Sequence, residues 1–224
     1  MREFNALKDY PQPKERVVGP NIRTTKNRII AAYRGKEYYD GDRKNGYGGF
    51  KYDGRWKTIV DFMCQEYKLN QDSSVLVVGC EKGFILHDFH EKFPKMKVRG
   101  VDISKYAIEN AMPSIKQYVQ EAPFTKLPFK DHEFDFVIAI GVVYTLNLAD
   151  AMKCLKEIQR VGKGKSFLTL GAYKDPVGER LFRYWTLLGS TILHVDDWKE
   201  VLQESGYTGD YFFSTAEYLN LKEQ

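Results

Sequence analysis

The sequence predicts an α/β protein with a Rossmann-like, doubly wound and mostly parallel sheet, helices on both faces and an N-terminal cap segment. Two observations predict this fold. From residue 74 onward, apolar runs alternate with helical patterns of about ten to fifteen residues, which is typical of βαβ units. The runs "SVLVVG" and "FDFVIAI" are continuously apolar, as in strands buried on both faces of a parallel sheet.

The elements follow in chain order from local patterns. Ser104 is suited to cap a helix that Pro113 kinks or ends, and Gly162 stops a long amphipathic helix. The expected strands cover residues 74–79, 97–102, 119–121, 134–140, 166–173 and 209–214, and the expected helices cover 57–69, 84–93, 105–112, 148–161, 178–188 and 195–206. A core at residues 57–224 therefore follows an N-terminal arm and cap at residues 1–56.

The N-terminal 56 residues have a different composition from the core. Residues 1–32 are polar and predict an extended arm with a short helix near 24–33. Residues 33–56 hold seven aromatic residues and six glycines, too many glycines for a regular helix or an alternating strand. We expect this aromatic segment to be a mobile lid, with a structural cover and a nucleic-acid stacking surface as the alternatives.

Composition and charge exclude several classes of protein. The 34 basic and 30 acidic residues are interleaved, unlike the clustered basic stripe of a nucleic-acid-binding protein. Three isolated cysteines predict neither a disulfide framework nor a metal site, and the charged N-terminus does not resemble a signal peptide. The apolar run Phe136–Tyr144 is too short to cross a bilayer. We expect a cytoplasmic protein that binds a small molecule and neither nucleic acid nor a membrane. A homodimer is an open alternative for its oligomeric state.

The turn after the first core strand is the strongest candidate for ligand binding. A dinucleotide turn, G-x-G-x-x-G, requires glycine at 79, 81 and 84, and only Gly79 matches, so the spacing excludes a nicotinamide oxidoreductase. A G-x-G-x-G turn requires 79, 81 and 83, where Gly79 and Gly83 match and Glu81 does not. The alternative is a tight turn without a ligand.

Asp102 ends the second core strand, nineteen residues after Gly83. A carboxylate at this place can accept hydrogen bonds from both hydroxyls of a ribose. The alternative is that Asp102 supports the N-terminus of the next helix. Together, the turn and the carboxylate favour a nucleoside-containing cofactor.

Three segments, Val75–Phe84, Gly100–Ser104 and Leu127–Ile140, together resemble the class I S-adenosylmethionine-dependent methyltransferases. The aromatic segment is similar to the cap of a small-molecule subgroup that modifies sugars or other metabolites. The resemblance implies S-adenosyl-L-methionine as cofactor and S-adenosyl-L-homocysteine as product. It implies cofactor contacts from Gly79, Cys80, Glu81 and Gly83 to the methionine part, from Asp102 and Ile103 to ribose and adenine, from Phe124 to the base, and from Gly141.

Three positions depart from the family pattern. Val77 and Pro123 stand where acidic or amide side chains are usual, and Glu81 replaces a glycine. Glu81 is expected either to point away from the methionine end of the cofactor or to take over the role of the missing acid there. The rival hypothesis is a non-catalytic descendant with altered cofactor use that acts as a binding or regulatory partner.

Candidate catalytic and substrate-binding residues lie near the strand ends and in the cap. Tyr144, expected to end the strand 136–144, is the first candidate for a general base and His194 the second, with a packed aromatic and a helix-entry residue as the alternatives. The expected substrate is a small polar metabolite such as a sugar or a sugar-derived compound. Its expected contacts are Tyr38, Tyr39, Arg43, Tyr47 and Tyr52 from the cap, and Arg180 and Tyr184, which suit a phosphate or carboxylate. The alternative for Arg180 is a solvated helix face.

Overall fold

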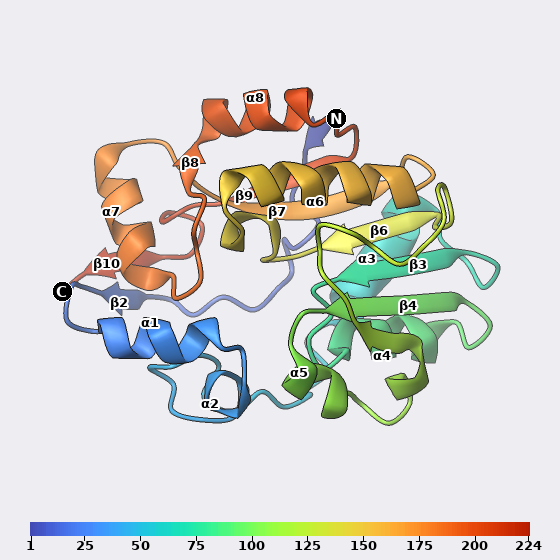
Figure 1. The fold of residues 1–224 in the computed structure, drawn as a ribbon, viewed down its shortest axis with the longest axis horizontal. Coiled ribbons are helices and arrows are strands. Elements are labelled where there is room, and N and C mark those ends of the chain that lie inside the picture. The colour runs from blue at the N-terminus through green and yellow to red at the C-terminus, as the bar shows by residue number, and fades with distance from the viewer.

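A computed structural model describes all residues, 1–224. The central sheet is formed by strands that all pair in parallel (Figure 1). Its order is β1 (Arg2–Glu3), β9 (Asp210–Ser214), β7 (Ser166–Tyr173), β6 (Phe136–Ala139), β3 (Ser74–Val78), β4 (Lys97–Asp102) and β5 (Val119–Glu121), with β8 (Leu193–His194) beside β7. The chain direction across the sheet reverses between β3 and β6, and this is the point where such sheets bind ligands.

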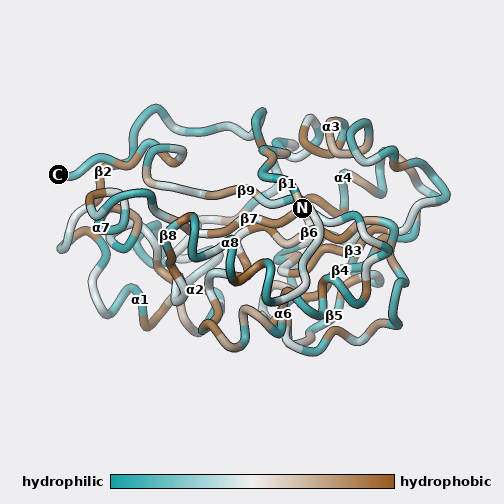
Figure 2. The backbone as a smooth tube through the Cα atoms, turned by 90° about the horizontal axis from the view of Figure 1, so that it is seen from above, coloured by the Kyte–Doolittle hydropathy of each residue, from teal (hydrophilic) through white to brown (hydrophobic).

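Helices cover both faces of the sheet (Figure 2). On one face lie α3 (Lys57–Tyr67) and α4 (Phe84–Lys92), and on the other α6 (Leu148–Val161) and α8 (Val195–Glu204). Successive side chains of β3 lie on opposite faces of the sheet. Val77 packs in the core under α3 and α4, and Leu76 packs in the core under α6 and α8. This double burial explains why the core strands are apolar without alternation.

The remaining elements lie around the carboxyl ends of the strands. They are α1 (Thr25–Ala32), α2 (Lys36–Tyr39), α5 (Lys105–Glu109), α7 (Pro176–Trp185) and the 3₁₀ turn η2 (Val143–Thr145). A second 3₁₀ turn, η1 (Lys116–Tyr118), directly precedes β5. None of these or the other helices combines the length and apolar character needed to cross a membrane.

The N-terminal arm pairs with the C-terminal part of the chain at two places. β1 extends the central sheet beyond β9. β2 (Arg16–Val18) forms a separate two-stranded sheet with β10 (Leu221–Glu223). Figure 1 shows the blue arm running beside the red C-terminal segments, with α1 and α2 below them. These pairings join residues about two hundred positions apart, and no local pattern in the sequence indicates them.

Most expected elements form within a few residues of their predicted bounds. The helix capped by Ser104 ends at Glu109, before Pro113, and α6 ends at Val161 next to Gly162. One expectation about position is wrong. The strand expected to reach Tyr144 ends at Ala139, because Gly141 adopts a left-handed conformation with φ +71° and turns the chain into η2. Tyr144 therefore lies on a turn beyond the strand.

Candidate active site

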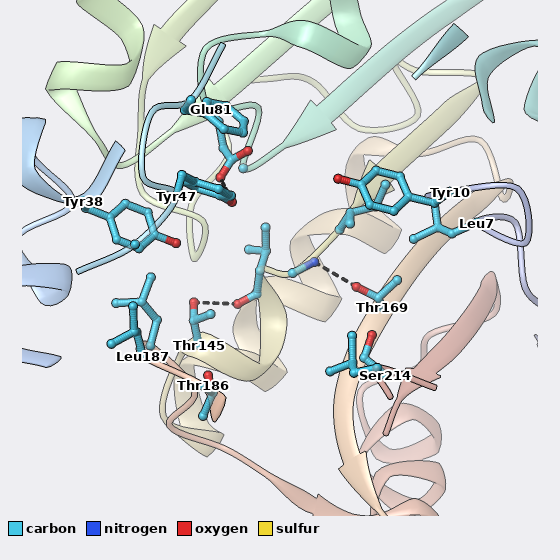
Figure 3. Close-up of a pocket in the computed structure, with 18 of the residues that line it drawn as sticks. Leu7, Tyr10, Tyr38, Tyr47, Glu81, Thr145, Thr169, Thr186, Leu187 and Ser214 are labelled. Atoms are coloured by element: carbon cyan, nitrogen blue, oxygen red, sulfur yellow. Dashed lines mark hydrogen bonds between the residues drawn. The ribbon is translucent and has the colours of Figure 1, made fainter. Parts of the chain in front are cut away.

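A cavity of about 460 Å³ lies at the carboxyl ends of β3, β4, β6 and β7. The strand ends and the turns after them form one wall, and the arm and the cap segment supply much of the rest (Figure 3). Figure 3 shows Glu81 beside Tyr47, with Tyr38 on the same side and Tyr10 of the arm across the cavity. The cavity thus coincides with the place where the strand order reverses.

The turn after β3 approaches its neighbours too closely for a side chain at its first position. A Cβ at Gly79 would lie 2.2 Å from Cγ2 of Val142, and the residue has φ +74°. Glu81, where the usual pattern has glycine, has φ +52°. A left-handed conformation costs a non-glycine residue roughly 1–2 kcal/mol. The backbone of the glycine pattern is therefore preserved at Glu81 although the glycine itself is absent.

Asp102 at the end of β4 holds this turn in place. Its side chain is 3% exposed. Oδ2 accepts the backbone N–H of Glu81 at 2.9 Å, and Oδ1 accepts that of Ser104 at 2.8 Å. Burial raises the pKa of Asp102, and these backbone hydrogen bonds oppose the rise. Since a carboxylate has about four acceptor sites, two remain for a ligand.

The side chain of Glu81 lies in the cavity and accepts a hydrogen bond from the Tyr47 hydroxyl of the cap. Burial raises the pKa of Glu81 to about 8, while the Tyr47 hydrogen bond opposes the rise. Glu81 therefore connects the cofactor turn to the cap. The side chain of Glu81 thus points into the cavity, toward the cap.

Further contacts hold the cap against the same turn. The ammonium of Lys82 forms a salt bridge with Asp40 at 2.7 Å, with the two side chains 10% and 25% exposed. Phe50 stacks on Phe84 with ring centroids 4.6 Å apart. The backbone carbonyl of Arg34 accepts the hydroxyl hydrogen of Ser104 at 2.6 Å. In this conformation the aromatic segment is docked on the core rather than open.

Tyr144 also lines the cavity, although it is not on a strand. Burial raises its pKa to about 12, with Arg34 opposing the rise. A hydroxyl with this pKa stays protonated at neutral pH and acts as a hydrogen-bond donor. Beside it, Arg34 donates to Oγ1 of Thr145 at 2.9 Å.

The expected cofactor and substrate residues divide into two sets by position. Those that line the cavity are Gly79, Cys80, Glu81, Asp102, Phe124, Gly141, Tyr144, Tyr38, Tyr39, Arg43 and Tyr47. Those outside its lining are Gly83, Ile103, Tyr52, Arg180, Tyr184 and His194.

The residues outside the lining have other contacts. Tyr52 donates a hydrogen bond to Asp88 on α4, and Arg180 forms a salt bridge with Glu223 at 2.8 Å. His194 caps α8 by accepting the N–H of Asp196, which fits the helix-entry alternative. Tyr184 packs beside the small cluster around Leu181. The structure therefore places these four side chains outside the cavity lining: Tyr52 is held on α4, Arg180 and Tyr184 lie on α7, and His194 caps α8.

Sequence reasoning missed the arginines of the arm. Arg16, Arg23 and Arg34 line the cavity together with the expected Arg43. Their positions depend on the pairing of β2 with β10 and on the packing of α1 near the end of α7. The only signal in the sequence is that five arginines lie between residues 16 and 43, and this signal does not say what they face.

Comparisons with known proteins agree with this architecture. Residues 76–170 match a protein-family model described as a methyltransferase domain. These residues therefore form a methyltransferase domain. The matched region runs from β3 into β7 and includes the turn after β3 and Asp102, so the expected methyltransferase enzyme class is confirmed.

Individual relatives of this methyltransferase are distant. An uncharacterized protein of Haemophilus influenzae is 29% identical over 171 residues, covering 70% of this chain and 67% of the relative. A protein of Campylobacter curvus named tRNA U34 carboxymethyltransferase is 28% identical over 113 residues, covering 48% of this chain and 37% of the relative. The chain thus spans about two thirds of the first relative and little more than one third of the second.

A solved structure supports the fold of the methyltransferase. The YcgJ protein of Bacillus subtilis superposes with a TM-score of 0.54 at 22% identity, covering 65% of this chain and 66% of that one. At this identity the likeness shows the shared fold. The expected Rossmann-like, mostly parallel sheet is therefore confirmed by both the strand pairing and this relative.

The residues of the methyltransferase turn fit S-adenosylmethionine. Gly79 leaves the close approach that a Cβ would block, and Asp102 retains acceptor sites beside it. Glu81 supplies a carboxyl group to the cavity lining, and Val77 supplies none. The donor and acceptor set therefore suits a ligand with ribose hydroxyls and a positive charge.

Proposed function

We propose that this protein transfers a methyl group from S-adenosylmethionine to a small polar metabolite that binds between the cap and the carboxyl ends of the strands. The observation that carries the proposal is the shared cavity. Gly79 and Asp102 of the family turn and the cap side chains Tyr38, Tyr39 and Tyr47 line the same space of about 460 Å³. A space of this size is in the range of small-molecule sites.

The cofactor would be held by the turn and its neighbours. Asp102 would accept the ribose hydroxyls, Glu81 would face the positively charged methionine part, and Phe124 would pack on the base. When bound, S-adenosylmethionine supplies an electrophilic methyl group for in-line displacement. The protein then contributes mainly orientation and exclusion of water, which for well-aligned reactants is worth roughly 7–11 kcal/mol.

The acceptor would lie on the cap side of the cavity. Tyr144 would donate a hydrogen bond to it, since its raised pKa makes it a poor proton acceptor at neutral pH. For a hydroxyl acceptor, Glu81 would receive the proton in its carboxylate form, since of the two acidic residues that line the cavity it is the one bonded to the cap. Because its pKa is raised to about 8, this form increases as the pH approaches 8. An amine acceptor attacks in its neutral form and needs no base.

A nucleic-acid acceptor is the competing proposal, since the Campylobacter relative carries a tRNA-modifying name. It is disfavoured by the docked cap, whose Lys82–Asp40 salt bridge and Tyr47–Glu81 hydrogen bond cover the turn. A base in a polynucleotide would have to pass this cover.

Calorimetry with S-adenosylmethionine, S-adenosylhomocysteine and NAD tests the proposal. We expect micromolar binding of the first two compounds and none of NAD. Methyl transfer is then followed as S-adenosylhomocysteine release with pools of small polar metabolites and with unfractionated tRNA. If neither adenosyl compound binds, the hypothesis of a non-catalytic descendant is favoured. If only tRNA is methylated, the acceptor is RNA and the small-metabolite proposal is wrong.

A further inference from the structure

Three arginines form a group on the cavity wall, which we call the arginine group: Arg16, Arg23 and Arg43. They come from three segments, namely the start of β2, the residues before α1, and the cap. They lie close enough to repel one another. Burial lowers the pKa of Arg16 and that of Arg23, the latter to about 10, and in both cases the charge of Arg43 lowers it further.

The arginine group has no carboxylate partner. Arg16 donates to the carbonyl of Leu219 and to the side-chain oxygen of Gln12, Arg23 to the carbonyl of Trp185, and Arg43 to the carbonyl of Gly46. Other arginines of the chain do form salt bridges: Arg2, Arg55, Arg160, Arg180 and Arg183. Arg28, Arg34 and Arg99 also have no carboxylate partner, so four of the six arginines without a salt bridge, namely the arginine group and Arg34, line the cavity.

The uncharged carbonyl and amide oxygens that accept these hydrogen bonds hold Arg16 and Arg23 in place and leave their positive charges unneutralised. Leu219 precedes β10, which pairs with β2, and Trp185 ends α7. A guanidinium has five N–H donors, and these hydrogen bonds use only some of them. The remaining donors of partly buried Arg16 and Arg23 are available to an oxyanion, which would also offset the mutual repulsion.

We propose that the arginine group binds an anionic group of the methyl acceptor, so that the substrate is a small phosphorylated or carboxylated metabolite. This proposal rests on the proposed function. Its anionic group would contact the guanidiniums, while the rest of the molecule reaches toward Glu81 and Tyr144. The anion contact that the sequence assigned to Arg180 therefore moves to the arm and the cap, because Arg180 is already paired with Glu223 outside the cavity.

Binding of simple oxyanions to the intact protein tests the proposal. Inorganic phosphate and acetate are titrated at constant ionic strength, with chloride as the reference salt and S-adenosylhomocysteine present. We expect saturable binding of one oxyanion above the effect of chloride. A stronger response to phosphate indicates a phosphoryl group on the substrate, and a stronger response to acetate indicates a carboxylate.

Arg43→Gln is the test variant, because Arg43 is exposed and anchors only its own loop. We expect its affinity for the oxyanion to fall about tenfold, the effect of losing one charge-assisted hydrogen bond. Arg16→Gln should show the same loss, and Arg43 keeps the test valid if Arg16→Gln fails to fold. Arg2→Gln is the matched control, since Arg2 pairs with Glu66 and Asp210 away from the cavity.

The outcomes separate this proposal from the one on which it rests. S-adenosylhomocysteine binding without an oxyanion response above chloride overturns the anionic-substrate proposal and leaves the methyltransferase function intact. An oxyanion response that is equal in wild type, Arg43→Gln and Arg2→Gln also overturns it. If tRNA binds through Arg43 while phosphate and acetate do not, the arginine group serves RNA instead. Failure to bind S-adenosylhomocysteine overturns the function itself.

Discussion

Two groups of charged residues face the same cavity, and they are built in different ways. The acidic group, Glu81 and Asp102, comes from the ends of adjacent strands and is braced by backbone hydrogen bonds. The arginine group, Arg16, Arg23 and Arg43, comes from the arm and the cap and is anchored on carbonyl and amide oxygens. The difference fits the function proposed above, in which the core would hold the cationic cofactor and the N-terminal 56 residues would select the acceptor.

The largest effect should come from the turn that supports the acidic group. Gly79→Ala forces a left-handed alanine and a Cβ 2.2 Å from Val142, so we expect a loss of about 3 kcal/mol in unfolding free energy. Denaturant unfolding measures the change. Gly35→Ala is the matched control, since a Cβ there meets nothing within 4 Å, and it should be nearly neutral. Equal stability of both variants would show that the turn accommodates a Cβ at residue 79.

A smaller effect is expected from the carboxylate itself. Asp102→Asn keeps the shape of the side chain but removes one acceptor function and the negative charge. Binding of S-adenosylmethionine should weaken about tenfold, the typical loss of a hydrogen bond to a charged group. Calorimetry gives the affinity, with exposed Asp196→Asn as the control. Unchanged affinity would remove Asp102 from the cofactor site.

The pH dependence of stability should report Glu81. Its pKa rises from 4.5 to about 8 on folding, so the folded state holds a proton that the unfolded state has lost. Stability should therefore fall as pH rises from about 4.5 to 8, because the unfolded state binds fewer protons in that window. Melting temperatures of wild type and Glu81→Gln across this range measure the effect. The variant should lack this component of the slope, and parallel curves would contradict the burial of Glu81.

Tyr47→Phe sharpens the same measurement. The Tyr47 hydroxyl lowers the pKa of Glu81, opposing burial. Its removal should move the decline in stability to higher pH. A decline that stays where it is in wild type would mean that the cap does not contact Glu81 in solution.

The smallest effect is expected from the arginine group of the ligand-free protein. Arg43→Gln removes a charge that repels Arg16 and Arg23, so it should leave stability unchanged or raise it by about 0.5 kcal/mol at low salt. The gain should shrink as salt screens the repulsion. Thermal unfolding at two salt concentrations tests this. A clear loss of stability would show that Arg43 supports the cap structurally.

The core was largely predictable from the sequence because its signals are local. Continuous apolar runs marked β3 and β6, Ser104 and Gly162 marked helix ends, and Asp102 was identified by its place at the end of the second core strand. Tyr144 was assigned to a strand because the apolar run continues past Gly141, and only the left-handed glycine shows where the strand ends. Arg180 and His194 were chosen for their chemistry, and α7 and α8 turn them away from the cavity.

The sequence by itself determined the six core strands of the sheet, its covering helices and the cofactor turn, since periodicity and spacing over a few tens of residues specify these features. Only the tertiary structure decided which charges share the cavity. The arm reaches it because β1 pairs with β9 and β2 with β10, contacts between opposite ends of the chain. The contact between Glu81 and Tyr47 also depends on the tertiary structure, because packing and ion pairing between distant segments dock the cap on the core. Such contacts produce no periodic pattern in the sequence.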